Sequence, residues 1–427
     1  MATYAEFIET KLRRASSCGR DVDVSELHSS LFDWQARIVA RAVRVGRIAV
    51  FADTGLGKTR MQVEWSRLSA SRSLILAPLS VARQTVREAQ KIGVDVTYAR
   101  DMSDIDGAGV FITNYERASK FDPSEFGAVC LDESSILKSF TGSTRNALIQ
   151  QWRDTPFRSS WSATPAPNDV TELCNQSEFL GVLPRNEMLA AYFVHDQDGW
   201  RLKGHAADPM FSWMRTWCIA ARKPSDVGGE DSDFELPDLV IEADVVDCPI
   251  QQDGQLFATD LGGVGGRAKI RKATLDARIE KTVDLLRRPG QWIAWCGLND
   301  EAKALAAAIP DSANVHGTLS PEDKTAAFEA FQDGDLRVLI TKPSIAGFGM
   351  NFQNCHQMAF VGINDSWESY YQSIRRCWRF GQTHPVTAHI VVSELEKSIV
   401  RNIERKESTV AWWVSRLVEH MNSEDQP

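Results

Sequence analysis

The stretch Ile48-Ala49-Val50-Phe51-Ala52-Asp53-Thr54-Gly55-Leu56-Gly57-Lys58-Thr59 decides the fold of this 427-residue chain. Its first four residues are apolar and predict a buried strand, the turn that follows contains two glycines, and residues 60–68 have a helical pattern. This order is typical of a phosphate-binding loop, because backbone N–H groups and a helix start can surround phosphate oxygens. A glycine-rich turn before a helix that happens to begin with Lys58 and Thr59 is the alternative, and the full motif disfavours it.

The residues of this loop would have different chemical roles. Lys58 would place a positive charge at the β and γ phosphates of a nucleotide, and Thr59 would ligate Mg²⁺. The glycines let the backbone curl around the phosphates. We therefore expect ATP and Mg²⁺ as cofactors. The loop residues predicted to bind the nucleotide are Thr54, Gly55, Gly57, Lys58 and Thr59.

A second polar pair follows the apolar run at 128–131. A magnesium nucleotide site needs a carboxylate at a strand end beside the phosphate loop, and Asp132 and Glu133 supply two. Asp132 would hold Mg²⁺ through water, and Glu133 would polarise the attacking water. Alone, an Asp-Glu pair after a strand usually marks only the start of a polar loop. The phosphate loop upstream makes both residues catalytic candidates, together with Lys58.

Outward from this site, short apolar runs alternate with helical patterns from Leu31 onward, which predicts an α/β fold with a parallel sheet. The alternation fades into Trp-rich, helical sequence at about 168–237 and then resumes. We predict two tandem lobes, each a parallel sheet flanked by helices. The predicted parts are an N-terminal helical extension at 1–30, a first, ATP-binding lobe at 31–237 that includes the helical segment, and a second lobe at 238–427. The predicted strands are 48–51, 74–77, 110–113, 128–131 and 159–162 in the first lobe, and 292–296, 314–316, 338–341, 358–361 and 388–392 in the second.

The composition excludes several classes of protein. The chain is 43% hydrophobic and 25% charged, a balance typical of folded soluble proteins. Its formal net charge of −9 argues against a protein that coats nucleic acid by bulk attraction, although phosphate contacts need only a few placed cations. No apolar run reaches the roughly eighteen residues of a membrane helix, and the N-terminus has no signal pattern. We expect no membrane partner and a cytoplasmic protein, in the host cytoplasm if a phage encodes it.

The metal-binding residue types show no pattern. The eight cysteines include no C-x-x-C pair, and the eight histidines form no H-x-x-x-H or H-x-E arrangement. Buried free thiols are therefore expected in place of disulfides or a zinc site.

Seven segments occur along the chain in the order of a known set of motifs. They are LFDWQ (31–35), ILAPL (75–79), ITNYE (112–116), DESS (132–135), SATP (162–165), ITKPSIAGFGMNF (340–352) and QSIRRCWRFGQ (372–382). This order, together with the phosphate loop, resembles superfamily 2 of the helicases and translocases, over about residues 31–392. Within it, the last segment resembles the SWI/SNF-like branch of double-stranded DNA translocases, in a compact form of the kind that phages carry.

The resemblance implies two RecA-like lobes and an ATP-dependent DNA translocase or helicase, which is a nucleic-acid-stimulated ATPase. ATP hydrolysis in the cleft between the lobes would be coupled to movement along DNA, so the expected partner is DNA, double-stranded by the form of the last motif. Two departures narrow this expectation. Ser135 stands where the family has a histidine, and the short stretch after Ser162 leaves no room for a histone-reading module, which argues against a nucleosome substrate.

The resemblance also assigns further residues. Gln35 would read adenine, and Gly347, in the glycine-rich motif of the second lobe, would also bind the nucleotide. Arg376 and Arg379 lie three apart, so on a helix they would project from one face as arginine fingers, each contributing about 10³ to 10⁵ in rate. From composition alone they would be a solvated cationic helix face, and the flanking motif residues reverse that preference. The expected nucleic-acid contacts are Pro78, Thr113, Ser344 and Asn351, and the expected coupling residues are Ser162, Thr164 and Gln372.

Three questions stay open at this stage. A strand-separating helicase for DNA or RNA is the alternative within the same class of enzyme. An ATP-gated binding switch with little turnover is the alternative from another class of protein. The complete set of predicted hydrolytic residues argues against it, because a switch does not need that set. The basic run Arg267, Lys269, Arg271 and Lys272 is a further candidate for DNA contact, and a solvated arm is an equally favoured interpretation.

Overall fold

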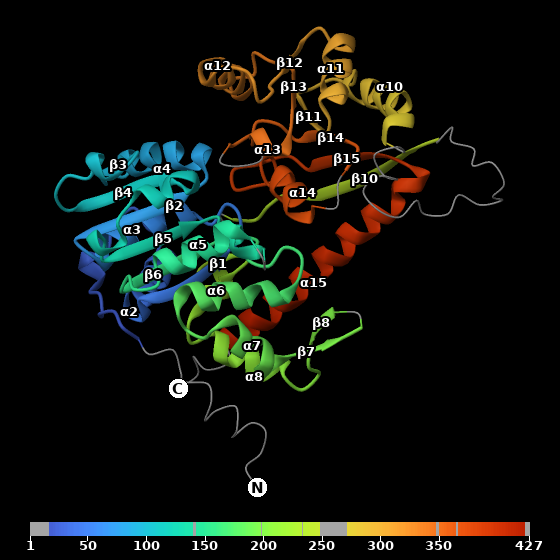
Figure 1. Ribbon diagram of the computed structural model, residues 1–427. Helices are drawn as coiled ribbons and strands as arrows, with labels where there is room; N and C mark the ends of the chain where they lie inside the picture. Colours follow the sequence, from blue (N-terminus) through green and yellow to red (C-terminus); the bar gives the residue numbers. More distant parts are fainter. Residues whose placement is uncertain are drawn as a thin grey trace. The chain divides into compact units, whose positions relative to one another are not determined.

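The computed structural model describes residues 17–139, 142–197, 199–232, 234–247, 271–346, 350–363 and 366–422. The chain forms two compact units, Met1–Phe234 together with Ser408–Pro427, and Glu235–Glu407. Each unit contains one parallel sheet flanked by helices (Figure 1), which confirms the predicted fold class. In the part of the chain that the structure describes, no helix has both the length and the apolar character needed to cross a membrane.

The first lobe is built on a seven-stranded sheet with the order β3-β4-β2-β5-β6-β1-β9, in which all neighbours are parallel. Most of its strands are short apolar runs that are buried along their length, as expected for a parallel sheet covered on both faces. The strands are β1 (Arg47–Ala52), β2 (Arg72–Ala77), β3 (Val96–Tyr98), β4 (Gly109–Asn114), β5 (Ala128–Asp132), β6 (Phe157–Trp161) and β9 (Cys218–Ala221). Because β6 lies between β1 and β5, the carboxyl ends of these three strands meet at one edge of the sheet.

The helices of the first lobe connect and cover these strands (Figure 1). The α-helices are α2 (Asp33–Val45), α3 (Lys58–Ser69), α4 (Leu79–Lys91), α5 (Ser143–Gln151), α6 (Leu173–Leu180), α7 (Arg185–Tyr192) and α8 (Ala207–Met214). The 3-10 helices are η1 (Val24–Glu26), η2 (Met102–Asp104), η3 (Tyr115–Lys120), η4 (Pro123–Glu125), η5 (Ser134–Lys138), η6 (Val170–Glu172) and η7 (Pro224–Val227).

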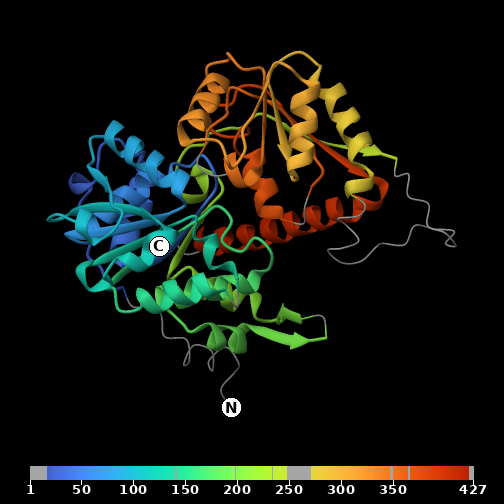
Figure 2. The ribbon, with the colours of Figure 1, turned by 45° about the horizontal axis from the view of Figure 1, so that its top comes forward.

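The segment at 168–237 differs from the helical segment that the sequence predicts. It contains α6, α7 and α8, but also an antiparallel hairpin of β7 (Phe193–Asp196) and β8 (Gly199–Leu202). Figure 2 shows this hairpin extending from the body of the first unit. The segment then returns as β9, which pairs with β1 at the edge of the main sheet.

The second lobe has a six-stranded parallel sheet with the order β10-β15-β14-β11-β13-β12. Its strands are β10 (Leu239–Val246), β11 (Trp292–Cys296), β12 (Ser312–Asn314), β13 (Val338–Thr341), β14 (Gln357–Val361) and β15 (Val386–Ser393). Its helices are α10 (Leu275–Leu286), α11 (Asn299–Ala308), α12 (Pro321–Gln332), α13 (Pro343–Ala346), α14 (Trp367–Ile374) and η8 (Glu394–Glu396), followed by α15 (Lys397–Asn422).

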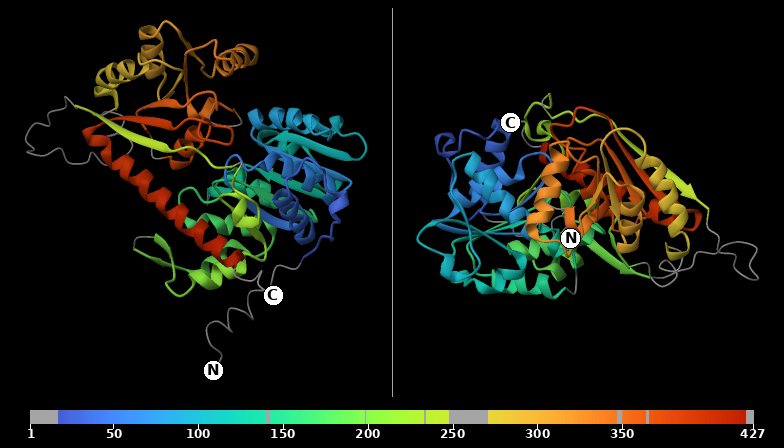
Figure 3. Two further views of the ribbon diagram at one scale, coloured as in Figure 1. Left: turned by 180° about the vertical axis from the view of Figure 1, so that it is seen from behind. Right: turned by 90° about the horizontal axis from the view of Figure 1, so that it is seen from above.

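The last helix, α15, belongs to both units. It runs unbroken from Lys397 to Asn422 (Figure 3), and the boundary between the units falls inside it, at Ser408. Trp413 is fully buried in the core of the first lobe, where its ring meets Phe51 edge-on at 6.2 Å between centroids. The division therefore differs from the predicted one, which gives all of 238–427 to the second lobe, because the apolar face of the helix after Ser408 completes the first core.

Two further expectations concern the thiols and the N-terminus. Cys18 is exposed and the other described cysteines are buried free thiols, as the sequence predicts, while Cys248 lies outside the described residues. Residues 1–16 of the predicted N-terminal extension also lie outside them. The rest of that extension contains one turn of 3-10 helix at Val24–Glu26.

Candidate active site

The predicted phosphate loop, called the phosphate loop below, lies between β1 and α3, in the expected strand, loop and helix context. Gly55 and Gly57 have φ of 93° and 75°, values that favour glycine, and Gly57 is the N-cap of α3. Lys58 folds back over the loop, where its Nζ donates to the carbonyls of Ala52 (3.0 Å) and Asp53 (3.3 Å). The ammonium group is therefore held at the loop itself, by acceptors that an incoming phosphate can replace.

Gln35 of α2 braces the same loop. Its side chain is buried, its Oε1 accepts from Phe32 N (3.1 Å), and its Nε2 donates to the carbonyl of Leu56 (3.0 Å). A Cβ at Gly57 would lie 2.4 Å from that Nε2. The positive φ favours glycine at this position, a side chain there would also have to displace the Gln35 amide, and the predicted adenine-reading residue lies against the predicted phosphate-binding residues.

Asp132 ends β5 and is buried. Its Oδ1 accepts from Gln62 Nε2 (2.7 Å) and from Glu133 N (3.0 Å). Burial raises the pKa of Asp132 above its ordinary value, although the Gln62 hydrogen bond and the charge of Lys58 act in the opposite direction. Since Lys58 acts on this carboxylate, the structure brings both residues to the same edge of the sheet. A carboxylate that is costly to ionise in a buried site gains from a nearby dication, which fits a magnesium ligand.

Sequence reasoning missed Gln62, which orients Asp132. Gln62 lies one turn after Lys58 in α3 and is fully buried. Gln62 comes four residues after Lys58, so the two side chains lie on the same helix face. This spacing is the sequence signal that could have identified Gln62. A buried amide facing a strand-end carboxylate is a positioning residue for that carboxylate.

Glu133 adopts left-handed backbone geometry with φ of 50°, alone among the described non-glycine residues. Such a conformation costs about 1 kcal/mol or more and persists only where the surroundings enforce it. Asn175 and Gln176 of α6, both fully buried, supply that enforcement by donating to the carbonyls of Leu137 (2.7 Å) and Ser134 (3.0 Å). The acidic turn is thus anchored by amide side chains that no motif indicated.

The predicted coupling residues of the first lobe form a small buried turn after β6. Ser162 Oγ accepts from Thr164 N (3.0 Å), and Ser162 N donates to Val50 O (3.2 Å) in β1. Both side chains are buried. Since β1 leads directly into the phosphate loop, this turn is attached to the strand that carries the loop.

Of the four residues predicted to contact nucleic acid, two lie in each unit. Pro78 is the half-buried N-cap of α4, Ser344 is exposed on α13, and the half-buried Asn351 donates through Nδ2 to Gln353 Oε1 (3.3 Å). Thr113, in β4, is fully buried in this conformation, and its contact with nucleic acid stays a prediction.

Arg376 and Arg379 lie close together, although not on a helix face as predicted. Helix α14 ends at Ile374, and both arginines follow in turns. Their NH1 atoms reach one acceptor, the carbonyl of Met350, at 3.0 Å and 3.5 Å. The turns after α14, and not the spacing of a helix, therefore bring the two guanidinium groups together.

The residues around the arginines form a tight framework. Gln372 is buried, and Gln382 Nε2 donates to the carbonyls of Gln353, Cys355 and Cys377 at 3.0–3.2 Å. Gly347 lies outside the described residues, as do Arg267 and Lys269 of the basic run. Arg271 of that run pairs with the buried Glu301 (3.1 Å), so it is not part of a solvated arm.

One comparison with known protein families matches a large part of the second lobe. Residues 277–381, from α10 to the arginine-bearing turn, match the family model of the helicase conserved C-terminal domain. No curated protein sequence gives a significant match to the chain. Among solved structures, the chain is similar to the SWI2/SNF2 ATPase core of Sulfolobus solfataricus in complex with dsDNA, at 16% identity and a TM-score of 0.45, over 95% of this chain and 98% of that chain.

Proposed function

We propose that the chain is a nucleic-acid-stimulated ATPase that uses hydrolysis to move along duplex DNA. The observation that carries the proposal is the convergence of Lys58, at the phosphate loop, with the buried carboxylate of Asp132 at one sheet edge. The helicase conserved C-terminal match over 277–381 supports it independently, because it covers the other lobe.

The residues at this edge fit a magnesium nucleotide. Gly55, Gly57 and Lys58 would hold the phosphates, Thr59 and Asp132 would hold Mg²⁺, and Gln35 would contact the base. When bound, Mg²⁺ supplies charge neutralisation at the phosphate oxygens. Glu133, held in its left-handed turn, would orient and polarise the attacking water, and Gln62 would keep the Asp132 carboxylate in one orientation.

Arg376 and Arg379 would complete hydrolysis by stabilising the charge that develops on the transferred phosphoryl group. Their guanidinium groups share the carbonyl of Met350, so a small rearrangement of one turn would move both together. Pro78, Ser344 and Asn351 would contact the nucleic-acid backbone, which positions a strand without reading its sequence. Ser162, Thr164 and Gln372 would couple the two ligands, as their motifs imply.

Strand separation is the second candidate function, and the β7–β8 hairpin favours it. The hairpin carries Trp200, which is 36% exposed and meets the His195 ring edge-on. An exposed aromatic ring can stack on an unpaired base. Duplex translocation remains the main proposal because the arginine motif has the SWI/SNF-like form.

The deciding experiment measures steady-state ATP turnover with duplex DNA, single-stranded DNA and RNA of equal length. Duplex translocation predicts the strongest stimulation by duplex DNA and displacement of a third strand from a triplex. Strand separation predicts unwinding of a forked duplex, which Trp200→Ala would abolish. Turnover that no nucleic acid stimulates, with ATP bound tightly, would instead indicate the ATP-gated switch.

A further inference from the structure

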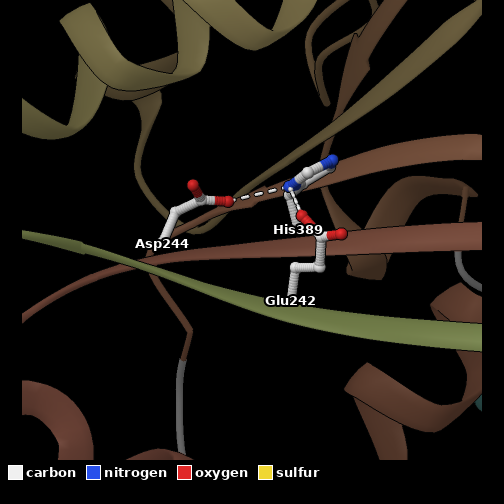
Figure 4. A group of neighbouring side chains, drawn as sticks. All are labelled: Glu242, Asp244 and His389. Carbon is white, nitrogen blue, oxygen red and sulfur yellow. Dashed lines mark hydrogen bonds and ion pairs between the residues drawn. The ribbon is translucent and has the colours of Figure 1, made fainter.

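A cluster of three potential metal ligands lies on the β10–β15 side of the second-lobe sheet. Glu242 and Asp244 are on β10, the edge strand of the sheet, and His389 is on its neighbour β15. Glu242 and His389 are Cα partners in the parallel register, and Asp244 is two residues further along β10. Side chains alternate along a strand, so all three project from the same face of the sheet (Figure 4).

The donor atoms converge on one point. His389 Nδ1 lies 2.8 Å from Asp244 Oδ2 and 3.3 Å from Glu242 Oε2, and one donor atom from each residue fits within 4.8 Å of the others. Two donors bound to one tetrahedral Zn²⁺ at about 2.0–2.1 Å lie about 3.3 Å apart. The two separations from His389 Nδ1 are therefore near those of a loaded site.

The surroundings hold the ligands in place and leave one side open. The side chains of His389 and Asp244 are 4% and 14% exposed, whereas that of Glu242 is 54% exposed. Lys281 of α10 binds the other oxygen of Asp244, Oδ1, at 2.8 Å, which orients the carboxylate and leaves Oδ2 directed at the imidazole. The indole ring of Trp292 packs beside the His389 ring, 5.7 Å between centroids, and fixes its position.

We propose that Glu242, Asp244 and His389 form a binding site for a first-row transition-metal dication, with Zn²⁺ the best fit and water in the remaining coordination positions. One imidazole with two carboxylates is a donor set that suits such ions, whereas Mg²⁺ prefers oxygen ligands alone. Metal binding requires the lone pair of Nδ1. A neutral imidazole shifts its proton to Nε2, and an imidazolium releases one proton to solvent.

The site would fasten the most exposed strand of the second lobe. Val240, Ile241 and Val245 of β10 are each 42–43% exposed, and β15 is the strand that β10 pairs with at this edge. A metal bound to both strands adds a cross-link between residues that are far apart in the chain. Opening of the edge strand would then require loss of the ion.

The test titrates ZnCl₂ into the full-length, nucleotide-free protein by isothermal titration calorimetry. We expect one tight site that MgCl₂ at the same concentration does not occupy. Glu242→Gln changes an exposed side chain and should leave folding intact, yet it should weaken Zn²⁺ binding at least about tenfold because a charged ligand is lost. His389→Gln should abolish the site. Glu394→Gln, at another exposed glutamate close to the end of β15, is the matched control and should bind Zn²⁺ like the unmodified protein.

Amide hydrogen exchange locates the ion. Saturating Zn²⁺ should slow exchange at the β10 amides in the unmodified protein and in the control, but not in Glu242→Gln. Zn²⁺ affinity that is unchanged in both ligand variants would place the ion elsewhere, for instance at other histidines or thiols, and would overturn the proposal. Absence of Zn²⁺ binding in the unmodified protein would also overturn it, leaving the cluster as an ion-pair network with Lys281.

Discussion

Each lobe contains a strand that turns directly into a helix, but opposite charges occupy the two junctions. In the first lobe, between β1 and α3, the group at the loop is the cation Lys58, which binds the carbonyls of Ala52 and Asp53. In the second lobe, between β11 and α11, it is the carboxylate of Glu301, whose Oε2 accepts from the backbone N–H groups of Gly297 and Leu298, both at 2.8 Å.

We call the first-lobe junction open and the second-lobe junction closed, because a carboxylate of the chain, Glu301, fills the start of α11. The N-terminus of a helix attracts negative charge. In the second lobe, Glu301 provides that charge from within the chain, and Arg278 and Arg271 neutralise its other oxygen at 2.7 Å and 3.1 Å. In the first lobe the side chain held at the loop is instead a cation, Lys58, as the proposed nucleotide site requires.

Lys58→Ala breaks the open junction and has the largest expected effect. The variant removes the cation at the phosphates, so ATP turnover should fall to background, a loss of more than about 10³-fold, while both lobes fold normally. Steady-state ATPase assays and circular dichroism measure the two quantities. Lys91→Ala, at an exposed lysine in the last turn of α4, is the control. Near-normal turnover in Lys58→Ala would refute the nucleotide site.

Arg379→Ala tests whether the second lobe contributes through its arginines and not through its closed junction. DNA-stimulated hydrolysis should fall about 10³-fold, because charge stabilisation in the transition state is lost, whereas the Kd for ATP should change only a few fold. Arg287→Ala, an exposed arginine after α10, should be harmless. If Arg379→Ala and Arg376→Ala both keep full turnover, the second lobe does not complete the active site.

Glu301→Gln opens the closed junction by removing its charge. Arg278 is fully buried and would lose its ionic partner, so the second lobe should lose about 3–5 kcal/mol of stability. Denaturant unfolding followed by tryptophan fluorescence measures the loss, with the exposed Glu322→Gln as control. Unchanged stability would mean that the carboxylate is not needed to fill this helix start.

Glu172 of η6 is also a buried carboxylate, and its pKa is raised. Unlike Glu301, which is paired with two arginines, Glu172 accepts hydrogen bonds from Asn168. Burial raises the pKa of Glu172 from 4.5 to about 7, although hydrogen bonds from Asn168 act against the rise. As pH rises from 4.5 to about 7, the unfolded chain releases this proton before the folded one does, so stability is full below that window and falls across it. The loss is at most roughly 3 kcal/mol.

Glu172→Gln mimics the protonated form and should remove this pH dependence. Thermal midpoints of the variant should match the unmodified protein at pH 4.5 and exceed it at pH 8. A variant that is less stable than the unmodified protein at pH 8 would show that the ionised carboxylate is stabilising in the fold.

Gln62→Leu has the smallest expected effect. It tests whether the hydrogen bond from Gln62 positions Asp132 beside the open junction. Without the amide, Asp132 loses the donor that fixes its Oδ1, and we expect kcat to fall about 10- to 100-fold, the range measured when the partners of metal ligands are removed. The Mg²⁺ concentration for half-maximal turnover should rise as well. A purely structural role would lower protein stability and leave this Mg²⁺ dependence unchanged.

The sequence predicted most strands of both sheets, because apolar runs are local signals, and the strand, loop and helix order around Lys58 is present as predicted. It missed β10, whose apolar run is broken by Glu242 and Asp244 and which is largely exposed at a sheet edge. It also missed β9, a four-residue strand, CIAA, inside a segment with helical patterning. Long apolar runs identify central strands better than they identify edges.

The supporting residues of the sites could not be predicted, because their roles depend on contacts between distant parts of the chain. Gln62 meets Asp132 across 70 residues, and His389 meets Asp244 across 145. Arg376 and Arg379 were identified by their motif, but their arrangement was wrong because α14 stops before them. Motif spacing suggests candidate residues, whereas the path of the backbone decides which of their side chains lie close together.

The shared helix α15 has a consequence for the order in which the protein folds during synthesis. Trp413, Leu417 and Val418 are part of the buried core of the first lobe, yet the ribosome adds them only after every residue of the second unit. A growing chain that has completed all seven strands of the first sheet still lacks these side chains, so an apolar surface stays uncovered while the second lobe is made. The second lobe has no such dependence and can reach its final packing first. The lobe that is translated first is thus the last to be finished.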